Sequence, residues 1–211
     1  MDPHSQQSLR ALLGQPGTPA QFKAISELDH TCADILALCP FAVVATAGAD
    51  GSCDASPRGG PPGFIRVLSP TRVAFGELPG NRLFDGAQNL AENPFAALLI
   101  MVPGMNETLR IEGRAAISTD ADVRQATAVD GTVPWGAIVI DVVKAFTHCG
   151  KAFKRAHLWE PESWPAAEDR PRIGAVIAAH MAAPGPDGRT RPPDVDALEK
   201  GLKESYEKRL W

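Results

Sequence analysis

Four short segments of this sequence combine charged or hydroxyl side chains with glycine in ways that suit the binding of an anion. The first segment is Asp54–Gly60, at the expected end of a strand, where Ser56 and Arg58 are followed by Gly59. Glycine lets the backbone approach a ligand closely, and the planar guanidinium of arginine suits phosphate. The same pattern is common in surface loops, so by itself it leaves a purely structural role open.

The second segment, Leu78–Arg82, precedes the apolar positions of an expected helix over residues 81–92. The amide groups at the start of a helix carry partial positive charge, so Arg82 in the first turn is mildly unfavourable on its own. An anion bound to those amide groups and to Arg82 would reverse the sign of this interaction, and phosphate is the obvious anion. Extension of Arg82 into water is the alternative.

The third segment, Glu107–Arg114, alternates polar and apolar residues, so Thr108, Arg110 and Glu112 share one face of an expected strand. This polar face could line a ligand groove, or it could be an ordinary ion-paired outer face.

The fourth segment, Thr147–Trp159, places five cationic or ionisable nitrogen side chains among apolar residues. Such a cluster in a chain of net negative charge indicates the rim of an anion or cofactor site. His148 and Cys149 are adjacent but lack a second pair of ligands, so no metal site is expected.

The hydrophobic pattern predicts a mainly β fold with flanking helices. A helix is expected from Thr18-Pro19 to a stop before Pro40, and a hairpin turn at Asp50-Gly51. No alternation of strand and helix appears, so the strands should pair antiparallel and curl into a small barrel. The expected strands are 41–47, 52–56, 63–68, 72–75, 95–102, 107–118 and one or two within 135–148; further helices are expected at 81–92, 119–128, 173–183 and 194–211.

The chain divides by composition into three parts. Residues 1–18 are polar and aperiodic and are expected to form an N-terminal arm, and residues 19–159 contain the expected barrel domain. After Trp159 prolines become frequent and helical patterns replace strands, so residues 160–211 are expected to be a helical extension of the same domain.

Charge and hydropathy exclude several classes of function. The net charge of −4 argues against a dedicated nucleic-acid binder, and no apolar run reaches membrane-spanning length. The N-terminal segment lacks the basic and apolar regions of a signal peptide. A cytoplasmic protein with four reduced cysteines is therefore expected.

Taken together, the four segments resemble the pyridoxamine 5′-phosphate oxidase-like FMN-binding split-barrel family. The resemblance is to its PPOX-class branch, and the order and spacing of the motifs carry it from about Ala20 to Trp159. In this chain the motifs are Ser56-Pro57-Arg58-Gly59, Pro79-Gly80-Asn81-Arg82, Pro103-Gly104 with Glu107-Thr108-Leu109-Arg110, and Lys151-Ala152-Phe153-Lys154-Arg155 with Leu158-Trp159.

The resemblance implies a six-stranded antiparallel Greek-key split barrel and a homodimer that holds FMN in a cleft between its two subunits. It places Arg58, Asn81 and Arg82 at the flavin phosphate. It further implies that Ser56, Pro57 and Gly59 lie beside the flavin, that Thr108 contacts the ring from a neighbouring strand, and that Lys151, Arg155 and Trp159 approach from the partner subunit.

The function implied is that of an FMN-dependent oxidoreductase acting on an unidentified small molecule. The alternatives are a non-catalytic flavin-binding or electron-transfer protein, and a split-barrel protein that uses F420 or haem. Oxidation of vitamin B6 is not expected, because Gly80-Asn81-Arg82 stands where the oxidases proper carry Ser-Arg-Lys, and their Trp-Arg-Leu-x-Pro-like end is absent.

Overall fold

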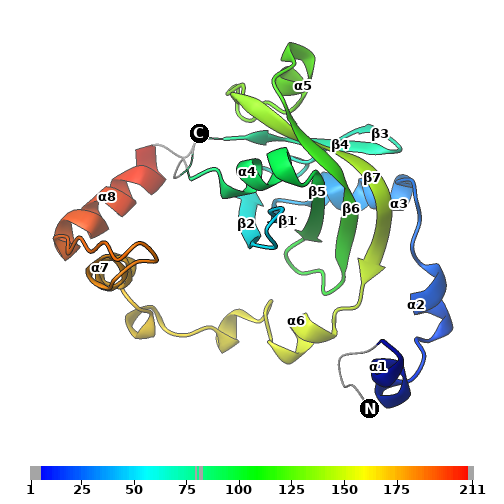
Figure 1. The fold of residues 1–211 in the computed structure, drawn as a ribbon, viewed down its shortest axis with the longest axis horizontal. Coiled ribbons are helices and arrows are strands. Elements are labelled where there is room, and N and C mark those ends of the chain that lie inside the picture. Colours follow the sequence, from blue (N-terminus) through cyan, green and yellow to red (C-terminus); the bar gives the residue numbers. More distant parts are fainter. Residues whose placement is uncertain (1–5, 79, 81–82, 209–211) are drawn as a thin grey trace. The chain divides into compact units, whose positions relative to one another are not determined.

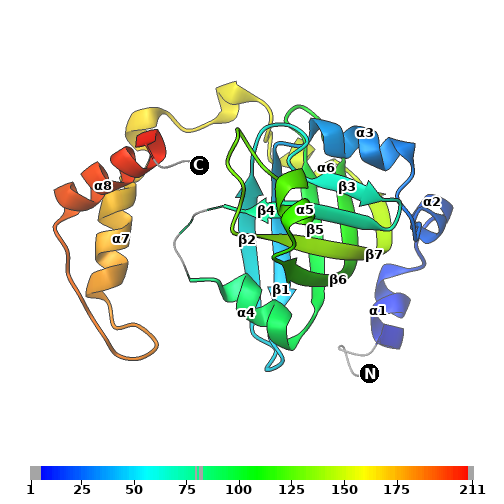
Figure 2. The ribbon, with the colours of Figure 1, turned by 90° about the horizontal axis from the view of Figure 1, so that it is seen from above.

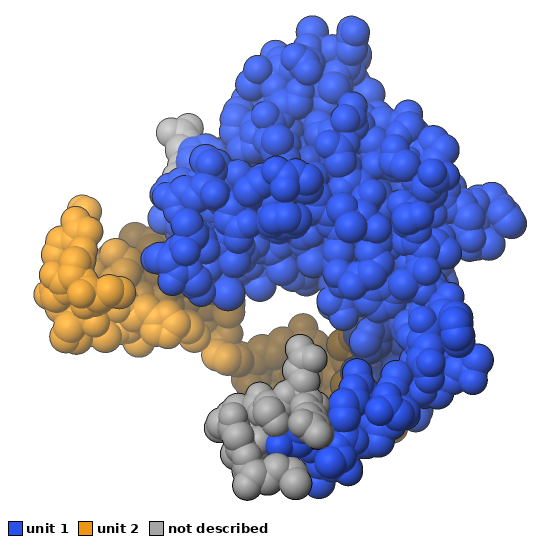
Figure 3. All heavy atoms as spheres, turned by 45° about the vertical axis from the view of Figure 1, so that its right-hand side comes forward, with its two compact units in different colours: residues 1–154 blue, residues 155–211 orange. Residues whose placement is uncertain are grey.

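The computed structural model describes residues 6–78, 80 and 83–208 of the chain. The chain forms two compact units, Met1–Lys154 and Arg155–Trp211, which Figure 3 shows in different colours. The boundary between the units follows Lys154. The expectation of one domain that includes residues 160–211 as an extension stays a prediction.

The first unit is built on a single antiparallel sheet of seven strands in the order β2-β1-β5-β6-β7-β4-β3 (Figure 1). Each strand pairs antiparallel with its neighbours, and β1 with β2 forms the hairpin expected at Asp50-Gly51. The strands are β1 Phe41–Ala47, β2 Cys53–Gly59, β3 Arg66–Ser69, β4 Arg72–Glu77, β5 Phe95–Met101, β6 Thr108–Ser118 and β7 Gly136–His148.

A mainly β antiparallel fold with flanking helices is thus confirmed, but the six-stranded Greek-key split barrel that the resemblance implies is corrected. The described residues contain seven strands, and residues 66–69, within the strand expected at 63–68 or next to it, pair with the start of β4. The sheet also has two ends, since β2 and β3 are not paired with each other. It nevertheless curls strongly, so that β1, β2 and β5 cross β4 and β7 in Figure 2.

The hydrophobic core lies on the inner face of the curled sheet. Alternate residues of the strands point there, including Val44 of β1, Leu98 of β5 and Ile111 of β6. The helix α3, His30–Leu38, adds Leu36, and α4, Asp85–Glu92, adds Leu90. The two helices therefore cover parts of the core that the open sheet would leave in water.

The predicted helix over residues 18–38 is in fact two helices, α2 at Thr18–Phe22 and α3. Between them Ile25 forms a bridge with Ala145 of β7, with hydrogen bonds of 2.9 and 2.8 Å in the two directions. Asp29 then caps α3 by accepting a hydrogen bond from the Cys32 amide at 2.9 Å. Pairing with a distant strand thus overrides the local helical pattern.

The long strands β6 and β7 change register at a bulge between Glu112 and Gly113. A Cβ atom at Gly113 would lie 2.1 Å from the Asp141 carbonyl oxygen, so only glycine fits there. Beyond the bulge Arg114 pairs with Asp141. Bulges in general increase the local twist of paired strands.

The remaining helices of the first unit are short. They are α1 Gln6–Leu13, α5 Ala121–Ala126 and α6 Lys151–Arg155, and the last residue of α6 belongs to the second unit. None of the helices in the described part of the chain has the length and apolar run needed to cross a membrane.

The second unit is a helical hairpin preceded by two 3₁₀ turns at Pro161–Ser163 and Ala167–Asp169. Its helices are α7 Ile173–Ala182 and α8 Val195–Lys208, which lie close to their predicted ranges. Glu199 of α8 accepts a hydrogen bond from the Gly174 amide at 2.9 Å, and Arg172 donates to Asp196 at 3.1 Å. These contacts fix the start of α7 against α8.

Candidate functional site

A cavity of about 520 Å³ opens between β2, the end of β4 and the start of α4. Its position follows from the split in the sheet, because β3 pairs only with Arg72–Ala74 and leaves the end of β4 without a strand on that side. The lining residues are Asp54, Ser56, Pro57, Arg58, Glu77, Gly80, Leu83, Phe84, Asp85, Gly86 and Ala87.

The polar side of the cavity is one face of β2. Asp54, Ser56 and Arg58 alternate along this strand and lie opposite inward-facing Thr46, Val44 and Ala42 of β1. Pro57 is tolerated between them because β2 is the edge strand, where a missing amide hydrogen leaves no pairing partner unsatisfied. The strand thus runs through the Ser-Pro-Arg-Gly motif, which the sequence placed at a strand end.

Arg58 is held by a two-point ion pair with Glu77. Its Nε donates to Oε1 at 2.8 Å and its Nη2 donates to Oε2 at 3.4 Å, while Nη1 donates to the Pro57 carbonyl oxygen at 3.0 Å. The Arg58 side chain is 25% exposed and that of Glu77 is 11% exposed. Because this ion pair is sheltered from water and hydrogen-bonded at two points, the Arg58 guanidinium is held in one orientation.

These three bonds determine which part of the guanidinium remains for a ligand. Arginine carries five N–H groups, and within the described part of the chain one hydrogen on Nη1 and one on Nη2 have no acceptor among these bonds. Nη1 and Nη2 can therefore still donate to an anion in the cavity that Arg58 lines, and arginine N–H groups suit phosphate and carboxylate.

The ion pair also links the two sides of the split. Arg58 belongs to the strand at one end of the sheet, and Glu77 belongs to the strand next to its other end. Glu77 points to the same face as the core residues Val73 and Phe75. Side chains therefore connect β2 with β4 where backbone pairing does not.

Phe84 forms another wall of the cavity in an unusual backbone conformation. It precedes α4 with φ 59° and ψ 23°, a region that residues other than glycine seldom adopt. Its ring packs edge-on against Trp135, with 5.6 Å between ring centroids. Such strain persists only where the surroundings hold it, and it is frequent at binding sites.

The helix that begins here starts later than predicted. Leu83 and Phe84 are not helical, and α4 starts at Asp85 rather than at residue 81. The carboxylate of Asp85 occupies the first turn, where a negative charge is favourable. Asn81 and Arg82, which were predicted at the phosphate, lie outside the described residues.

The rest of the lining is packed closely. Ser56 Oγ donates to Asp54 Oδ2 at 2.5 Å, and Asn89 of α4 donates to Thr46 Oγ1 at 3.0 Å. A Cβ atom at Gly86 would lie 3.3 Å from Asp54 Oδ2, so glycine lets α4 approach β2. The shape of the cavity is therefore set by both elements.

Among the described residues of the first unit, the predicted residues Gly59, Thr108 and Lys151 are not in the lining of this cavity, whereas Pro57 is. Pro57 and Gly59 alternate with Ser56 and Arg58 and so belong mainly to the outer face of the sheet. Thr108 begins β6, is buried, and pairs with His148 of β7. It lines a separate groove of about 400 Å³ on that outer face.

The fourth predicted segment spans the boundary of the two units. Lys151 is the exposed first residue of α6, next to groove residue Ala152. Arg155 and Trp159 belong to the second unit. Their role at the site stays a prediction.

Sequence reasoning missed Glu77, Asp54 and Phe84. Glu77 gave a signal, since it ends the apolar run Val73–Phe75 at an inward position of β4, where a carboxylate needs a partner. Asp54 alternates with Ser56 and Arg58 and could have been assigned to the same face. Nothing local indicates the conformation of Phe84.

The four cysteines are free and divide into two classes. Cys32 and Cys39 are in the core, and burial raises the pKa of both thiols, that of Cys32 to about 11. Cys53 and Cys149 are exposed. The described residues contain no group of three or more His, Cys, Asp or Glu side chains placed to hold a metal ion.

Comparison with known proteins includes one family model that matches more than half of the chain. No curated protein matches. Among solved structures the chain is similar to HupZ of Group A Streptococcus, with 18% identity over 57% of this chain and 93% of that chain and a TM-score of 0.47. It is similar to a candidate pyridoxamine 5′-phosphate oxidase of Lactobacillus delbrueckii, with 19% identity over 59% and 99% of the two chains and a TM-score of 0.45. It is also similar to the FAD binding protein of Mycobacterium smegmatis, with 17% identity over 59% of this chain and 97% of that chain and a TM-score of 0.41. A family model described as pyridoxamine 5′-phosphate oxidase matches residues 28–149.

Proposed function

We propose, on the premise that this chain belongs to the pyridoxamine 5′-phosphate oxidase family, that it binds FMN with the phosphate group at Arg58 and acts as an oxidoreductase on a small molecule. The observation that carries the proposal is the Arg58 guanidinium, which Glu77 and the Pro57 carbonyl hold in place beside the cavity with N–H groups of Nη1 and Nη2 left to donate. Predicted phosphate ligands Asn81 and Arg82 fall in the segment that leads to α4, whose Gly80 and Leu83 also line the cavity.

The other lining groups suit the remainder of an FMN molecule. A volume of about 520 Å³ is within the usual range for small-molecule sites. The carboxylates of Asp54 and Asp85 can accept hydrogen bonds from the hydroxyl groups of a ribityl chain, and Ser56, whose proton goes to Asp54, can also accept. Phe84 offers an apolar wall. The described lining carries three carboxylates and one guanidinium, so a dianionic phosphate must be held at Arg58 and at the segment containing Arg82.

FMN supplies the hydride and electron transfer, and the protein supplies binding, orientation and charge. Cations near the ring stabilise the negative charge that reduction produces. Lys151 and Arg155 are proposed for this role, with Trp159 beside them and all three contributed by the partner subunit. Thr108, Pro57 and Gly59 on the outer face are proposed to contact the ring.

The outer face of the sheet supports the proposed homodimer. It exposes apolar side chains that a monomer would leave in water, with Phe95 54% exposed and Val143 59% exposed. These residues line a groove of about 630 Å³ that also contains Ala45, Ala97 and Ala55. We propose that a second copy of the chain covers this face, because large exposed apolar patches mark interaction surfaces. Sedimentation at micromolar concentration tests the proposal, and a monomer with flavin bound would contradict it.

The test of the cofactor is direct. The purified protein should show flavin absorption bands or should acquire them when FMN is added. Parallel titrations with F420 and haem address the other cofactors used with this fold. Absence of flavin bands together with no FMN binding would end the proposal.

A second candidate function is that of a flavin carrier or electron-transfer protein without a substrate. It is favoured by the cavity carboxylates Asp54 and Glu77, which are both engaged with neighbouring side chains and so are poorly placed to move a proton. NAD(P)H-dependent reduction of the bound flavin with turnover of an acceptor would contradict this candidate.

A further inference from the structure

A third groove of the sheet, of about 340 Å³, lies beside α5. Its middle is apolar, because Ala116 of β6 and Val139 of β7 lie directly opposite each other there. Leu68 of β3 and Val123 of α5 add further apolar surface. We refer to this cavity as the α5 groove.

The two ends of the α5 groove carry opposite charges. Arg114 is exposed, and its guanidinium carbon lies over the ring of Phe95, 5.2 Å from the ring centroid. Within the described part of the chain this guanidinium makes no ion pair. Asp120 is also exposed, and among the same residues its carboxylate has no cation within ion-pair distance, while its amide donates to Ser118 Oγ at 3.2 Å. The groove therefore has a positive end and a negative end.

A further ion pair beside the groove neutralises itself. Asp141 of β7 lies directly opposite both Arg72 of β4 and Arg114 of β6, but it accepts a hydrogen bond from Arg72, at 2.7 Å. The described lining thus contains two arginines and two aspartates, and their formal charges sum to zero. A ligand that carries both a positive and a negative group complements such a groove better than a simple anion does.

The distance between the charged ends fits a short extended chain. Arg114, Ala116 and Ser118 alternate on one face of β6, so Arg114 and Ser118 are roughly 13 Å apart at about 3.3 Å per residue. Asp120 follows two residues after Ser118. An extended peptide spans at most about 3.3–3.6 Å per residue, so roughly four residues reach from one end to the other.

We propose that the α5 groove binds a short extended peptide with free termini and apolar side chains. The carboxylate of the peptide lies at Arg114, whose guanidinium suits a carboxylate, and the ammonium group lies at Asp120. The apolar side chains lie on Ala116, Val139 and Val123. A cavity that combines apolar surface with a few polar groups is typical of ligand sites.

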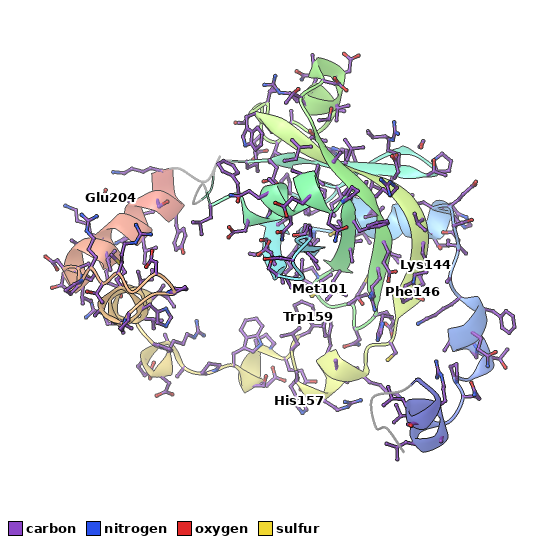
Figure 4. All side chains as sticks on the ribbon, viewed as in Figure 1. Met101, Lys144, Phe146, His157, Trp159 and Glu204 are labelled. Carbon is purple, nitrogen blue, oxygen red and sulfur yellow. The ribbon has the colours of Figure 1, made fainter. Side chains whose placement is uncertain are left out.

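The α5 groove is separate from the sites proposed above. It shares no described lining residue with the Arg58 cavity or with the two grooves assigned to the flavin ring and to the second copy. Figure 4 labels Lys144 and Phe146 near the end of β7 that leads to α6, where Lys23 and Arg110 also approach the ring of Phe146. The α5 groove lies beyond the bulge of β6, toward the other end of β7. It does not rest on the proposed function.

The test is calorimetric titration of the full chain, saturated with FMN if it binds FMN. The probe is the tetrapeptide Ala-Leu-Leu-Ala, used with free termini, with an acetylated N-terminus, with an amidated C-terminus and with both termini blocked. We expect the free peptide to bind most tightly. Acetylation and amidation should each weaken binding about threefold, as is usual for one exposed charge pair. Both losses should shrink when the salt concentration is raised.

Two variants should each remove the effect of one blocking group. In Arg114→Gln, amidation of the peptide should no longer weaken binding, while acetylation still should. In Asp120→Asn the two effects should be exchanged. The matched controls are Arg66→Gln and Asp122→Asn, which remove exposed charges of β3 and α5 outside the lining. Both controls should retain both losses. A purely structural role of Arg114 or Asp120 would change the affinity of all four peptides alike.

Three results would overturn the proposal. One is the absence of binding by the free peptide at millimolar concentration, and another is equal affinity for all four peptides. The third is dissociation of a dimer by the peptide in sedimentation, because the groove would then belong to a contact between subunits.

Discussion

Arg58 and Arg110 are both strand arginines paired with a glutamate, but they occupy opposite faces of the sheet and opposite electrostatic situations. Arg58 is matched one to one by Glu77 in a sheltered pair, and its guanidinium lines a cavity. Arg110 shares Glu112 with Lys144, and its side chain is 37% exposed beside two further cations. The pair with Glu77 fixes the orientation of the Arg58 guanidinium, whereas the surroundings of Arg110 bring several positive charges close together.

The difference shows two ways in which one fold can place positive charge. An ordered guanidinium discriminates by shape, so it suits one defined phosphate group. Exposed cations attract any anion, and that attraction weakens as salt is raised. The following predictions test whether burial and pairing separate the two arginines as this comparison requires.

The largest effect is expected for Arg58→Ala. The substitution leaves the sheltered carboxylate of Glu77 without its cation and removes the link between β2 and β4. The free energy of unfolding should therefore fall by about 2–4 kcal/mol. Urea unfolding at neutral pH measures this fall. The double variant Arg58→Ala with Glu77→Gln should recover part of the loss, and a fall below about 1 kcal/mol in the single variant would show that the pair is solvated.

The reactivity of the four cysteine thiols tests the contrast between buried and exposed positions. A pKa of about 11 for Cys32 instead of 9.0 lowers its thiolate fraction at neutral pH about a hundredfold, and burial shields Cys39 as well. Iodoacetamide followed by mass spectrometry should modify Cys53 and Cys149 in the folded protein, and all four cysteines in urea. Rapid native modification of Cys32 would mean that α3 opens readily from the core.

A smaller effect is expected for Arg110→Ala. Glu112 keeps its contact with Lys144, and the groups are 30–43% exposed, so the free energy of unfolding should fall by less than about 1 kcal/mol. The same urea experiment applies. A loss equal to that of Arg58→Ala would remove the distinction between the two faces.

The smallest effect concerns Asp29, an exposed carboxylate whose pKa is set mainly by hydrogen bonds. Hydrogen bonds from Thr31 and from the Cys32 amide lower its pKa from 3.8 to about 2. Because the folded pKa is lowered, its contribution to stability is present above about pH 3.8 and is lost as the pH falls toward 2. Wild type should exceed Asp29→Asn in stability at pH 5, and the difference should shrink by pH 2. A difference independent of pH would contradict the lowered pKa.

Local patterns in the sequence account for the elements that depend on neighbouring residues. The hairpin at Asp50-Gly51, the apolar strand Phe95–Met101 and the helices of the second unit lie close to their predicted ranges. The break between α2 and α3 was not predicted, because the bridge from Ile25 to Ala145 joins residues far apart in the chain. Asp29 is a residue type that often caps a helix, so it could have indicated a new helix start. The helical spacing of the apolar residues on both sides of it favoured one continuous helix instead.

In the candidate site too, contacts between residues far apart in the chain could not be predicted from the sequence. Resemblance to the family singled out Ser56 and Arg58, and the structure places both in one cavity. Neither Glu77 nor the ring of Phe84 could be assigned to that cavity, because only the curl of the sheet brings β4 and the start of α4 to β2. Lys23 and Phe146 likewise meet through pairing between distant segments.

The central claim is that the Arg58 guanidinium binds the phosphate of FMN, and one ratio tests it most directly. The dissociation constants of FMN and of riboflavin, which lacks the phosphate, should be measured for wild type and for Arg58→Lys, which keeps the charge but not the fork. Arg58→Lys should weaken FMN binding by about 1.5–3 kcal/mol and leave riboflavin binding unchanged, so the preference for FMN should fall roughly tenfold or more. An equal change for the two ligands, or no change for either, would show that the phosphate lies elsewhere.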